Sequence, residues 1–178
     1  MEEYPLRWIN DYLAVGYAPR STDQLQWIHN AGISAIVNLC AECYDLHEAE
    51  KASNFEVLYL AVTDEEAPTL AQIQATVEWI DLQKDLGKKT LVHCRYGVGR
   101  TGTVVLAHLL HCGISFNEAE KMMEHTPSWP ATNVQKRCID NYTKTLQAGS
   151  IQAHFEEKCS GSIGRFFRRL EVVLKWDD

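Results

Sequence analysis

Long apolar runs, repeats and low-complexity tracts are all missing from this sequence. No stretch of eighteen consecutive apolar residues occurs, so we expect no transmembrane helix and no stable membrane insertion. The opening residues, Met-Glu-Glu-Tyr-Pro, lack the basic segment and apolar core of a secretory signal, and we expect none. The lack of repeats and biased segments speaks against repeat architectures.

Positive charge is also scarce. The 17 Lys and Arg residues are outnumbered by 24 Asp and Glu residues, which gives a formal net charge of −7 at pH 7. A nucleic-acid-binding protein needs a basic face, so we expect no nucleic-acid partner. A phosphate site is still allowed, because the positive potential that it needs is local. The length of 178 residues and the 46% hydrophobic content describe one ordinary globular domain.

The six cysteines lack the spacing of a zinc site. Cys40 and Cys43 form one Cys-x-x-Cys pair, but no second pair of ligands accompanies it. We therefore expect neither a metal nor any other cofactor. Three further cysteines, Cys112, Cys138 and Cys159, are expected to be structural.

One stretch combines a strand, a glycine-rich loop and a helix. Residues 90–92 are short, apolar and β-branched, which predicts a buried strand, and residues 103–112 form an apolar run of helical length before a glycine. Between them lie Cys94, Arg95, Tyr96, Gly97, Val98 and Gly99. Backbone N–H groups of such a loop point inward and the helix dipole adds positive potential, so this segment is typical of an anion-binding cradle.

Three side chains in this segment supply reactive chemistry. Cys94 lies near a helix N-terminus, where the thiol pKa of about 8.5 can fall by several units. The planar guanidinium of Arg100 can bind two phosphate oxygens at once. The hydroxyl of Thr101 can donate a hydrogen bond to the cysteine sulfur and steady it as a leaving group. A thiolate facing a bound phosphate is suited to nucleophilic displacement; the alternative is an inert buried cysteine in a turn.

The pattern His93-Cys94, five residues, then Arg100-Thr101 resembles the signature of the cysteine-based protein tyrosine phosphatases. The glycines and the Arg-Thr-Gly ending are most similar to the small atypical dual-specificity phosphatases. The resemblance implies that Cys94 is the nucleophile and that the loop residues 95–99 bind the phosphate. It also implies that His93 supports the loop from behind. A catalytic thiolate favours a reducing compartment, so we expect a cytoplasmic protein.

Asp64 is the candidate general acid. It lies 30 residues before Cys94, where a predicted strand ends, and Glu65, Glu66 and Pro68 follow it. A solvated acidic loop is the simpler interpretation of these residues. However, the position resembles the general-acid loop of the same phosphatases, which implies that Asp64 protonates the leaving oxygen. Glu65 and Glu66 are substitutes for this role.

Other matches to the superfamily concern redox chemistry and the attacking water. The stretch Asn-Leu-Cys-Ala-Glu around Cys40 resembles phosphoinositide phosphatases, which implies a reversible disulfide between Cys40 and Cys94 under oxidation. Cys43 is an alternative resolving thiol, and a buried structural cysteine is the simpler interpretation of Cys40. Gln135 matches the family's Thr-x-x-Gln, which implies a place near the attacking water; a surface glutamine is the alternative.

Strands and helices are predicted to alternate, which favours a single α/β domain with a largely parallel sheet whose ligands bind beyond the carboxyl ends of its strands. The predicted strands cover residues 8–9, 12–16, 33–39, 55–60 and 90–92. The predicted helices cover residues 22–31, part of 42–52, 69–86, 103–112, 117–125 and 133–146.

We expect a phosphatase-like catalytic domain over residues 1–148 and an extension over 149–178. Gly149 and Ser150 are interpreted as a hinge, and residues 163–176 can form an amphipathic helix with balanced charges. We expect this helix to dock on its own domain or to form a homodimer with a second subunit.

The resemblance implies a phosphatase that acts on phosphotyrosine in proteins, with phosphoserine and phosphothreonine as further substrates, through a phosphocysteine. A phosphoinositide or other polyphosphate substrate is the alternative, favoured by the positive charge of Arg95 at the loop and by the surroundings of Cys40. Arg95 can equally pair with Glu65 or Glu66. A phosphate-binding module without turnover is disfavoured, because Cys94, Arg100, Thr101 and Asp64 are all present.

Overall fold

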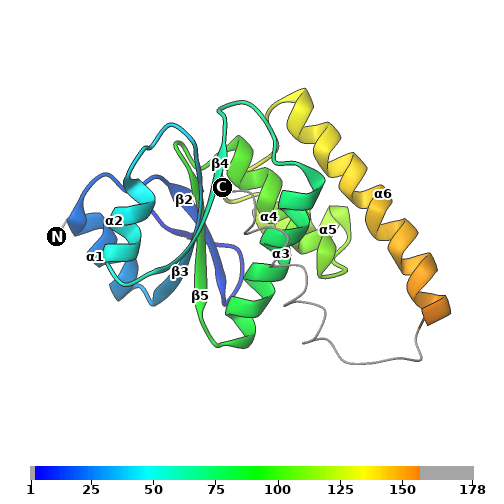
Figure 1. The fold of residues 1–178 in the computed structure, drawn as a ribbon, viewed down its shortest axis with the longest axis horizontal. Coiled ribbons are helices and arrows are strands. Elements are labelled where there is room, and N and C mark those ends of the chain that lie inside the picture. Colours follow the sequence, from blue (N-terminus) through cyan, green and yellow to red (C-terminus); the bar gives the residue numbers. More distant parts are fainter. Residues whose placement is uncertain (1–2, 157–178) are drawn as a thin grey trace, which may run out of the picture.

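The computed structural model describes residues 3–156, which form an α/β domain with a five-stranded sheet between two layers of helices (Figure 1). The strands are β1 (Arg7–Trp8), β2 (Leu13–Tyr17), β3 (Ile33–Cys40), β4 (Glu56–Val62) and β5 (Lys89–Cys94). They lie in the order β1-β2-β5-β3-β4. The pair β1 and β2 is antiparallel, and the other neighbours are parallel, so the predicted largely parallel sheet is confirmed.

Helices α1 (Thr22–Asn30) and α2 (Leu46–Ala52) lie on one face of the sheet. On the other face are α3 (Leu70–Asp85), α4 (Gly99–His111), α5 (Phe116–Met123) and α6 (Asn133–Glu156), as Figure 1 shows. Each layer buries its own apolar cluster against the sheet: Ile28 of α1 and Ile36 of β3 belong to the cluster on one side, and Val77 of α3 and Val104 of α4 to the cluster on the other. Burial of these side chains from water is the main force that holds the layers together.

Side-chain caps fix where α1 and α3 begin. Ser21 accepts a hydrogen bond from the Gln24 backbone N–H at 3.2 Å, and Thr69 forms a reciprocal capping box with Gln72. A β-hydroxyl at the N-cap satisfies a backbone N–H that has no partner within the helix, which fixes where the helix begins.

The predicted boundaries of α4 and α5 need correction. Helix α4 begins at Gly99 rather than at residue 103, and the absence of side chains at Gly99 and Gly102 lets its first turn fit closely against Gln135 and the Trp129 backbone. Helix α5 begins at Phe116 rather than at residue 117, since the Ser115 hydroxyl and Glu118 form a capping box there. It ends at Met123 rather than at residue 125.

Helix α6 is also longer than predicted. It continues to Glu156 instead of ending near residue 146, so the expected hinge at Gly149 and Ser150 is wrong. A glycine inside a helix costs only about 1 kcal/mol, which does not by itself end a helix. The boundary at residue 148 therefore lies within α6, and the division into two parts stays a prediction. The predicted amphipathic helix at 163–176 lies outside the described residues.

Candidate active site

The loop between β5 and α4 carries the predicted reactive groups. Cys94 is the last residue of β5, at the carboxyl end of the parallel strands, and its residue is only 3% exposed. Arg100 and Thr101 lie in the first turn of α4. Val98, the N-cap of this helix, has no side-chain hydrogen bond to the first turn, so the N–H groups there can bind an anion.

Close packing fixes the shape of this loop. Gly97 has a φ of +71°, and a Cβ at this position would lie 2.4 Å from the Gly16 carbonyl oxygen on β2. The buried Ser128 hydroxyl donates a hydrogen bond to the Gly97 carbonyl at 2.5 Å. Glycine is required where the backbone is left-handed and a second strand approaches this closely. The sequence did not indicate Ser128 as a loop contact.

The environment of Cys94 favours its thiolate. Burial raises the pKa of the Cys94 thiol, but hydrogen bonds from Thr101 and from the Tyr96 backbone, together with the Arg100 charge, outweigh it and lower the pKa overall. Within the described residues the buried Thr101 hydroxyl has no oxygen or nitrogen partner, which leaves it available to the sulfur. A thiolate at neutral pH is the nucleophilic form of cysteine.

Arg100 is buried and bound by two carboxylates. Its guanidinium donates to both oxygens of Glu42 at 2.8 and 2.6 Å and to Asp64 Oδ1 at 2.8 Å. It also donates to the Val62 carbonyl at 2.7 Å. Burial lowers the pKa of Arg100, but the hydrogen bonds to Glu42 and the nearby anionic groups outweigh it, so Arg100 stays charged. The same hydrogen bonds hold the pKa of Glu42 below its usual value.

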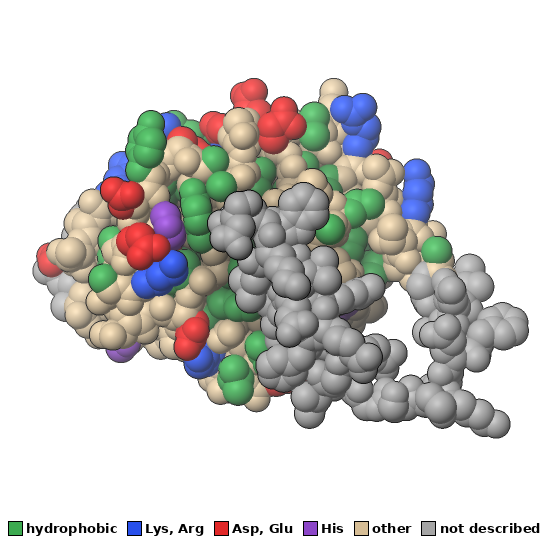
Figure 2. Space-filling model, viewed as in Figure 1, with side chains coloured by type: hydrophobic (Ala, Val, Ile, Leu, Met, Phe, Trp, Pro, Cys, Tyr) green, Lys and Arg blue, Asp and Glu red, His purple; other side chains and the backbone are tan. Residues whose placement is uncertain are grey.

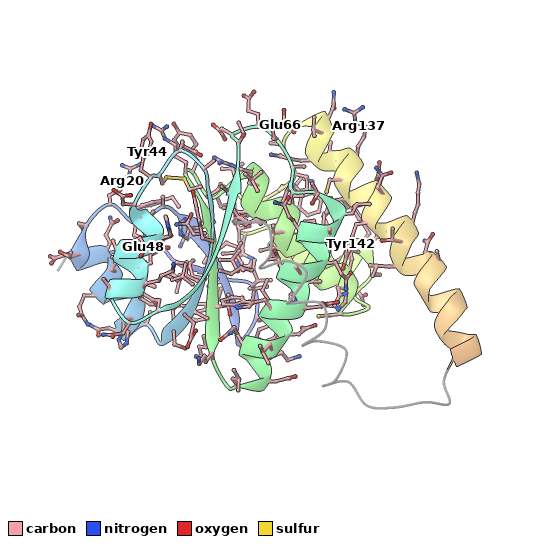
Figure 3. The ribbon with its side chains drawn as sticks, viewed as in Figure 1. Arg20, Tyr44, Glu48, Glu66, Arg137 and Tyr142 are labelled. Atoms are coloured by element: carbon pink, nitrogen blue, oxygen red, sulfur yellow. A yellow bond between two sulfur atoms is a disulfide. The ribbon has the colours of Figure 1, made fainter. Side chains whose placement is uncertain are left out.

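Asp64 lies beside the loop, because β4 and β5 run in the same direction and end at the same edge of the sheet. It follows β4 at the same edge of the sheet as Cys94, and its side chain is 53% exposed. Figures 2 and 3 show acidic side chains, with Glu66 labelled, projecting from this edge near the beginning of α6. The structure therefore brings Asp64 and Arg100 together, whereas Glu42 was not predicted to take part. The sequence feature that could have indicated Glu42 is its position two residues after Cys40, where the strand ends.

Gln135 joins the acid loop to α6. Its side chain donates to the Glu66 carbonyl at 3.0 Å and accepts from the Ala131 and Thr132 backbone N–H groups at 2.9 and 3.1 Å. It is 1% exposed and lies against Gly99, so it is not the surface glutamine of the alternative interpretation. Its place near an attacking water stays a prediction.

His93 lies behind the loop in a buried polar network. Its Nε2 is 2.8 Å from Glu50 Oε1, and Glu50 Oε2 accepts from the Asn38 amide at 3.0 Å. The Asn38 side chain in turn accepts from the Cys40 backbone N–H at 2.9 Å. All three side chains are fully buried. Neither Glu50 nor Asn38 was singled out by the sequence, because a helix and two strands bring them together.

The cysteine pairing differs from the implied one. Cys40 forms a disulfide with Cys43, and Cys94 is free, so the structure does not contain the Cys40–Cys94 disulfide (Figure 3). The bonded pair encloses Glu42, the residue that holds Arg100. Proximity in the chain explains this pairing, since the Cα atoms are 5.3 Å apart.

A pocket of about 580 Å³ adjoins the loop on the side of α2. Its lining includes Arg20, Arg95 and the exposed Tyr96, together with Glu42 and Cys43. The Arg95 guanidinium lies 5.4 Å from the Tyr96 ring centroid, and within residues 3–156 it makes no ion pair with Glu65 or Glu66. The pocket therefore places two cationic side chains beside the anion cradle.

This fold and this site are those of a dual-specificity or protein-tyrosine phosphatase domain, a class of cysteine-dependent phosphatase domains. Residues 4–160 match the family model described as "Swiss Army Knife protein, DSP-PTPase phosphatase domain". The match covers most of the chain, and the protein belongs to this family, PTP-SAK.

Relatives and solved structures agree with this assignment. The chain is 26% identical over 170 residues to the dual specificity protein phosphatase PHS1 of Arabidopsis thaliana, covering 93% of this chain and 16% of that protein. It is 31% identical over 110 residues to the phosphatidylglycerophosphate phosphatase PTPMT2 of Arabidopsis thaliana, covering 58% and 48%. The chain thus spans less than half of either relative. The crystal structure of Tk-PTP in its active form is similar, with 28% identity, a TM-score of 0.72 and coverage of 80% and 99%.

No helix among residues 3–156 is long and apolar enough to cross a membrane.

Proposed function

We propose that this protein hydrolyses phosphotyrosine in proteins through a phosphocysteine formed on Cys94, and that phosphoserine and phosphothreonine are further substrates. The observation that carries the proposal is the meeting of Cys94, Arg100 and Asp64 at one edge of the sheet, with the Cys94 pKa lowered. A nucleophile, an anion clamp and a proton donor are the groups that displacement at phosphorus requires.

Substrate binding would begin with an exchange at Arg100. Asp64 now occupies one guanidinium nitrogen, Nη2, but its side chain is half exposed, and such ion pairs contribute about 1 kcal/mol or less. A phosphate dianion, held also by the loop N–H groups, displaces the Asp64 carboxylate. Glu42 keeps its hydrogen bonds and holds the guanidinium toward the phosphate. Asp64 then takes up a proton from solvent and is free to approach the leaving oxygen.

The chemistry follows in two displacements. The Cys94 thiolate attacks phosphorus, the bond from phosphorus to the leaving oxygen breaks, and Asp64 gives that oxygen its proton. Water then attacks the phosphocysteine, Asp64 takes a proton from it, and inorganic phosphate leaves while the thiolate is restored. Thr101, which donates to the sulfur, stabilises the thiolate as it departs.

The rim of the site supports a phosphotyrosine substrate. The Tyr96 ring is 58% exposed beside the loop, where it can stack on the phenyl ring of a substrate. The dual specificity phosphatase relatives agree with a protein substrate.

The second candidate is a phosphoinositide or other polyphosphate substrate. The pocket with Arg20 and Arg95 favours it, because two guanidinium groups beside the cradle can bind a second phosphate. A relative named as a phosphatidylglycerophosphate phosphatase supports a lipid substrate as well.

Phosphate release from a matched panel decides between the two candidates. The panel holds phosphotyrosine and phosphothreonine peptides beside phosphoinositides, with dithiothreitol and a chelator present and the Cys94→Ser variant as the blank. We expect the phosphotyrosine peptides to have the highest kcat/KM. A tenfold lead for the lipids, which is a transition-state preference of about 1.4 kcal/mol, would reverse the assignment.

A further inference from the structure

A second cluster of ligating side chains lies at the other end of α4 from the phosphate loop. His108 and His111 are in the last turn of α4, and Cys112 is its C-cap. Asp81 approaches from the adjacent helix α3, where its carboxylate is 3.9 Å from His108 and 3.5 Å from His111. Spacings of three and four residues place the α4 side chains on one face of the helix. The phosphatase mechanism uses none of these groups.

The spacing of these atoms matches a small cation. One ligand atom each from Asp81, His108 and Cys112 lie within 4.8 Å of one another. Around a tetrahedral zinc ion, with bonds of 2.0 to 2.3 Å, neighbouring ligand atoms are about 3.3–3.8 Å apart. The Cys112 sulfur is 3.7 Å from His108 Nε2, whose lone pair points away from that of Nδ1, so the Cys112 side chain has to rotate toward Nδ1 for both groups to bind one ion.

His108 provides an independent sign that a ligand is missing. It is fully buried, and its Nδ1 has no hydrogen-bond partner within the described residues. Its other nitrogen, Nε2, is 3.1 Å from the Tyr12 hydroxyl. A buried ring nitrogen without a partner costs free energy, which a metal bond to the ring would offset.

His111 is oriented as a metal ligand would be. Tyr142 projects from α6 toward α3 (Figure 3), and its hydroxyl donates to Gln74 Oε1 at 3.1 Å. The same oxygen is 3.1 Å from His111 Nδ1, which must then be the donor. In neutral His111 this leaves an unprotonated Nε2 facing the Asp81 carboxylate at 3.5 Å. A cation between this nitrogen and the carboxylate can bind both groups.

We propose that Asp81, His108, His111 and Cys112 bind one Zn²⁺ ion at a structural site that joins α3 to α4. A thiolate with two imidazoles and one carboxylate is a ligand set that suits zinc. On binding, the Cys112 thiol loses its proton to solvent as the sulfur–zinc bond forms. The proposal departs from the expectation of no metal, which considered only the Cys40 and Cys43 pair.

Cobalt is the probe for this site, because Co²⁺ bound to a thiolate in tetrahedral geometry gives visible and near-ultraviolet absorption bands. The titration uses the full chain with Cys94→Ser, which removes the catalytic thiol, and no reductant, which keeps the Cys40–Cys43 disulfide. We expect one Co²⁺ per chain with a sulfur-to-cobalt band, and loss of the band when Zn²⁺ is added.

Matched variants identify which cysteine sulfur binds the metal ion. Cys112→Ser should abolish the sulfur-to-cobalt band, whereas Cys138→Ser should retain it, because Cys138 lies beside the Pro68 carbonyl and outside the cluster. Asp81→Asn should weaken Co²⁺ binding at least tenfold. Zn²⁺ should raise the Tm of the Cys94→Ser protein by about 5 °C at saturating concentration but not that of the protein that also carries Cys112→Ser. No band at all, or a band that survives Cys112→Ser, would overturn the proposal.

Discussion

Arg100 is shared between a carboxylate that stays and a carboxylate that must leave. Glu42 binds both terminal nitrogens and is partly covered, whereas Asp64 binds one nitrogen and is half exposed. Glu42, which is held by two hydrogen bonds, positions the guanidinium, and substrate displaces Asp64, which is held by one. This difference between two acidic residues assigns them different roles, positioning for Glu42 and proton transfer for Asp64.

Replacing Asp64 should therefore impair turnover more than binding. We expect Asp64→Asn to lower kcat on phosphotyrosine peptides about 10²–10⁴-fold, because the amide cannot protonate the leaving oxygen. The loss should be smaller on an aryl ester whose leaving group needs no proton. Glu66→Gln is the matched control in the same exposed loop and should keep kcat within about twofold. Equal losses on both kinds of ester would argue against the acid role, and steady-state kinetics measures all of these quantities.

The pKa of Cys94 gives a second residue-level prediction. Its thiol pKa is lowered, so the sulfur is a thiolate from that pKa upward and a thiol below it. Alkylation of Cys94 by iodoacetamide, followed by peptide mass spectrometry, should therefore have a midpoint pH below the ordinary thiol value of about 8.5. Thr101→Ala should move the midpoint upward, because it removes a hydrogen bond to the sulfur.

Thr103→Ala is the control for that experiment. The Thr103 hydroxyl is buried on the same helix but donates to the Gly99 carbonyl at 2.8 Å rather than to sulfur. The midpoint of this variant should match that of the unaltered protein. If both variants move the midpoint equally, a general disturbance of α4 is the cause, and the role of Thr101 is not supported.

At the scale of elements, the sequence predicted what local chemistry determines. Strands and helices were located because apolar spacing and helix ends are determined within a few residues, as the Ser21 and Thr69 caps of α1 and α3 show in the structure. The boundaries of α4 and α5 were wrong where the deciding contact was distant or where a better cap was adjacent. Position 99, the first residue of α4, has to be glycine because Gln135, 36 positions later, leaves no room for a side chain.

In the candidate active site, too, residues defined by local spacing could be predicted and residues defined by distant contacts could not. Cys94, Arg100 and Thr101 could be predicted because their spacing within one loop carries the chemistry. Asp64 could be predicted because the carboxyl ends of parallel strands share an edge. Glu42 and Ser128 could not, because their contacts with Arg100 and Gly97 span 58 and 31 residues of chain. No local pattern distinguishes them from other polar residues.

At the scale of the whole molecule, one buried network links the loop to the opposite layer. Glu50 on α2 accepts from Asn38 on β3 and lies 2.8 Å from His93 on β5, so a helix and two strands meet at one fully buried carboxyl group. His93 directly precedes Cys94. The network therefore ties the position of the loop to the stability of the fold.

Removing Glu50 should lower the free energy of unfolding by about 2–5 kcal/mol, because Glu50→Ala leaves two buried polar partners unsatisfied. Typical domains have about 5–15 kcal/mol in total, so this loss is a large fraction. Glu48→Ala, on the same helix, removes the contacts of an exposed carboxylate with Lys51 and His47 and should cost far less than Glu50→Ala. Urea unfolding measures the free energy of unfolding of both variants.

In a double-mutant cycle, Glu50→Ala and His93→Ala should couple by at least about 0.5 kcal/mol. Additive losses would show that His93 supports the loop by packing alone.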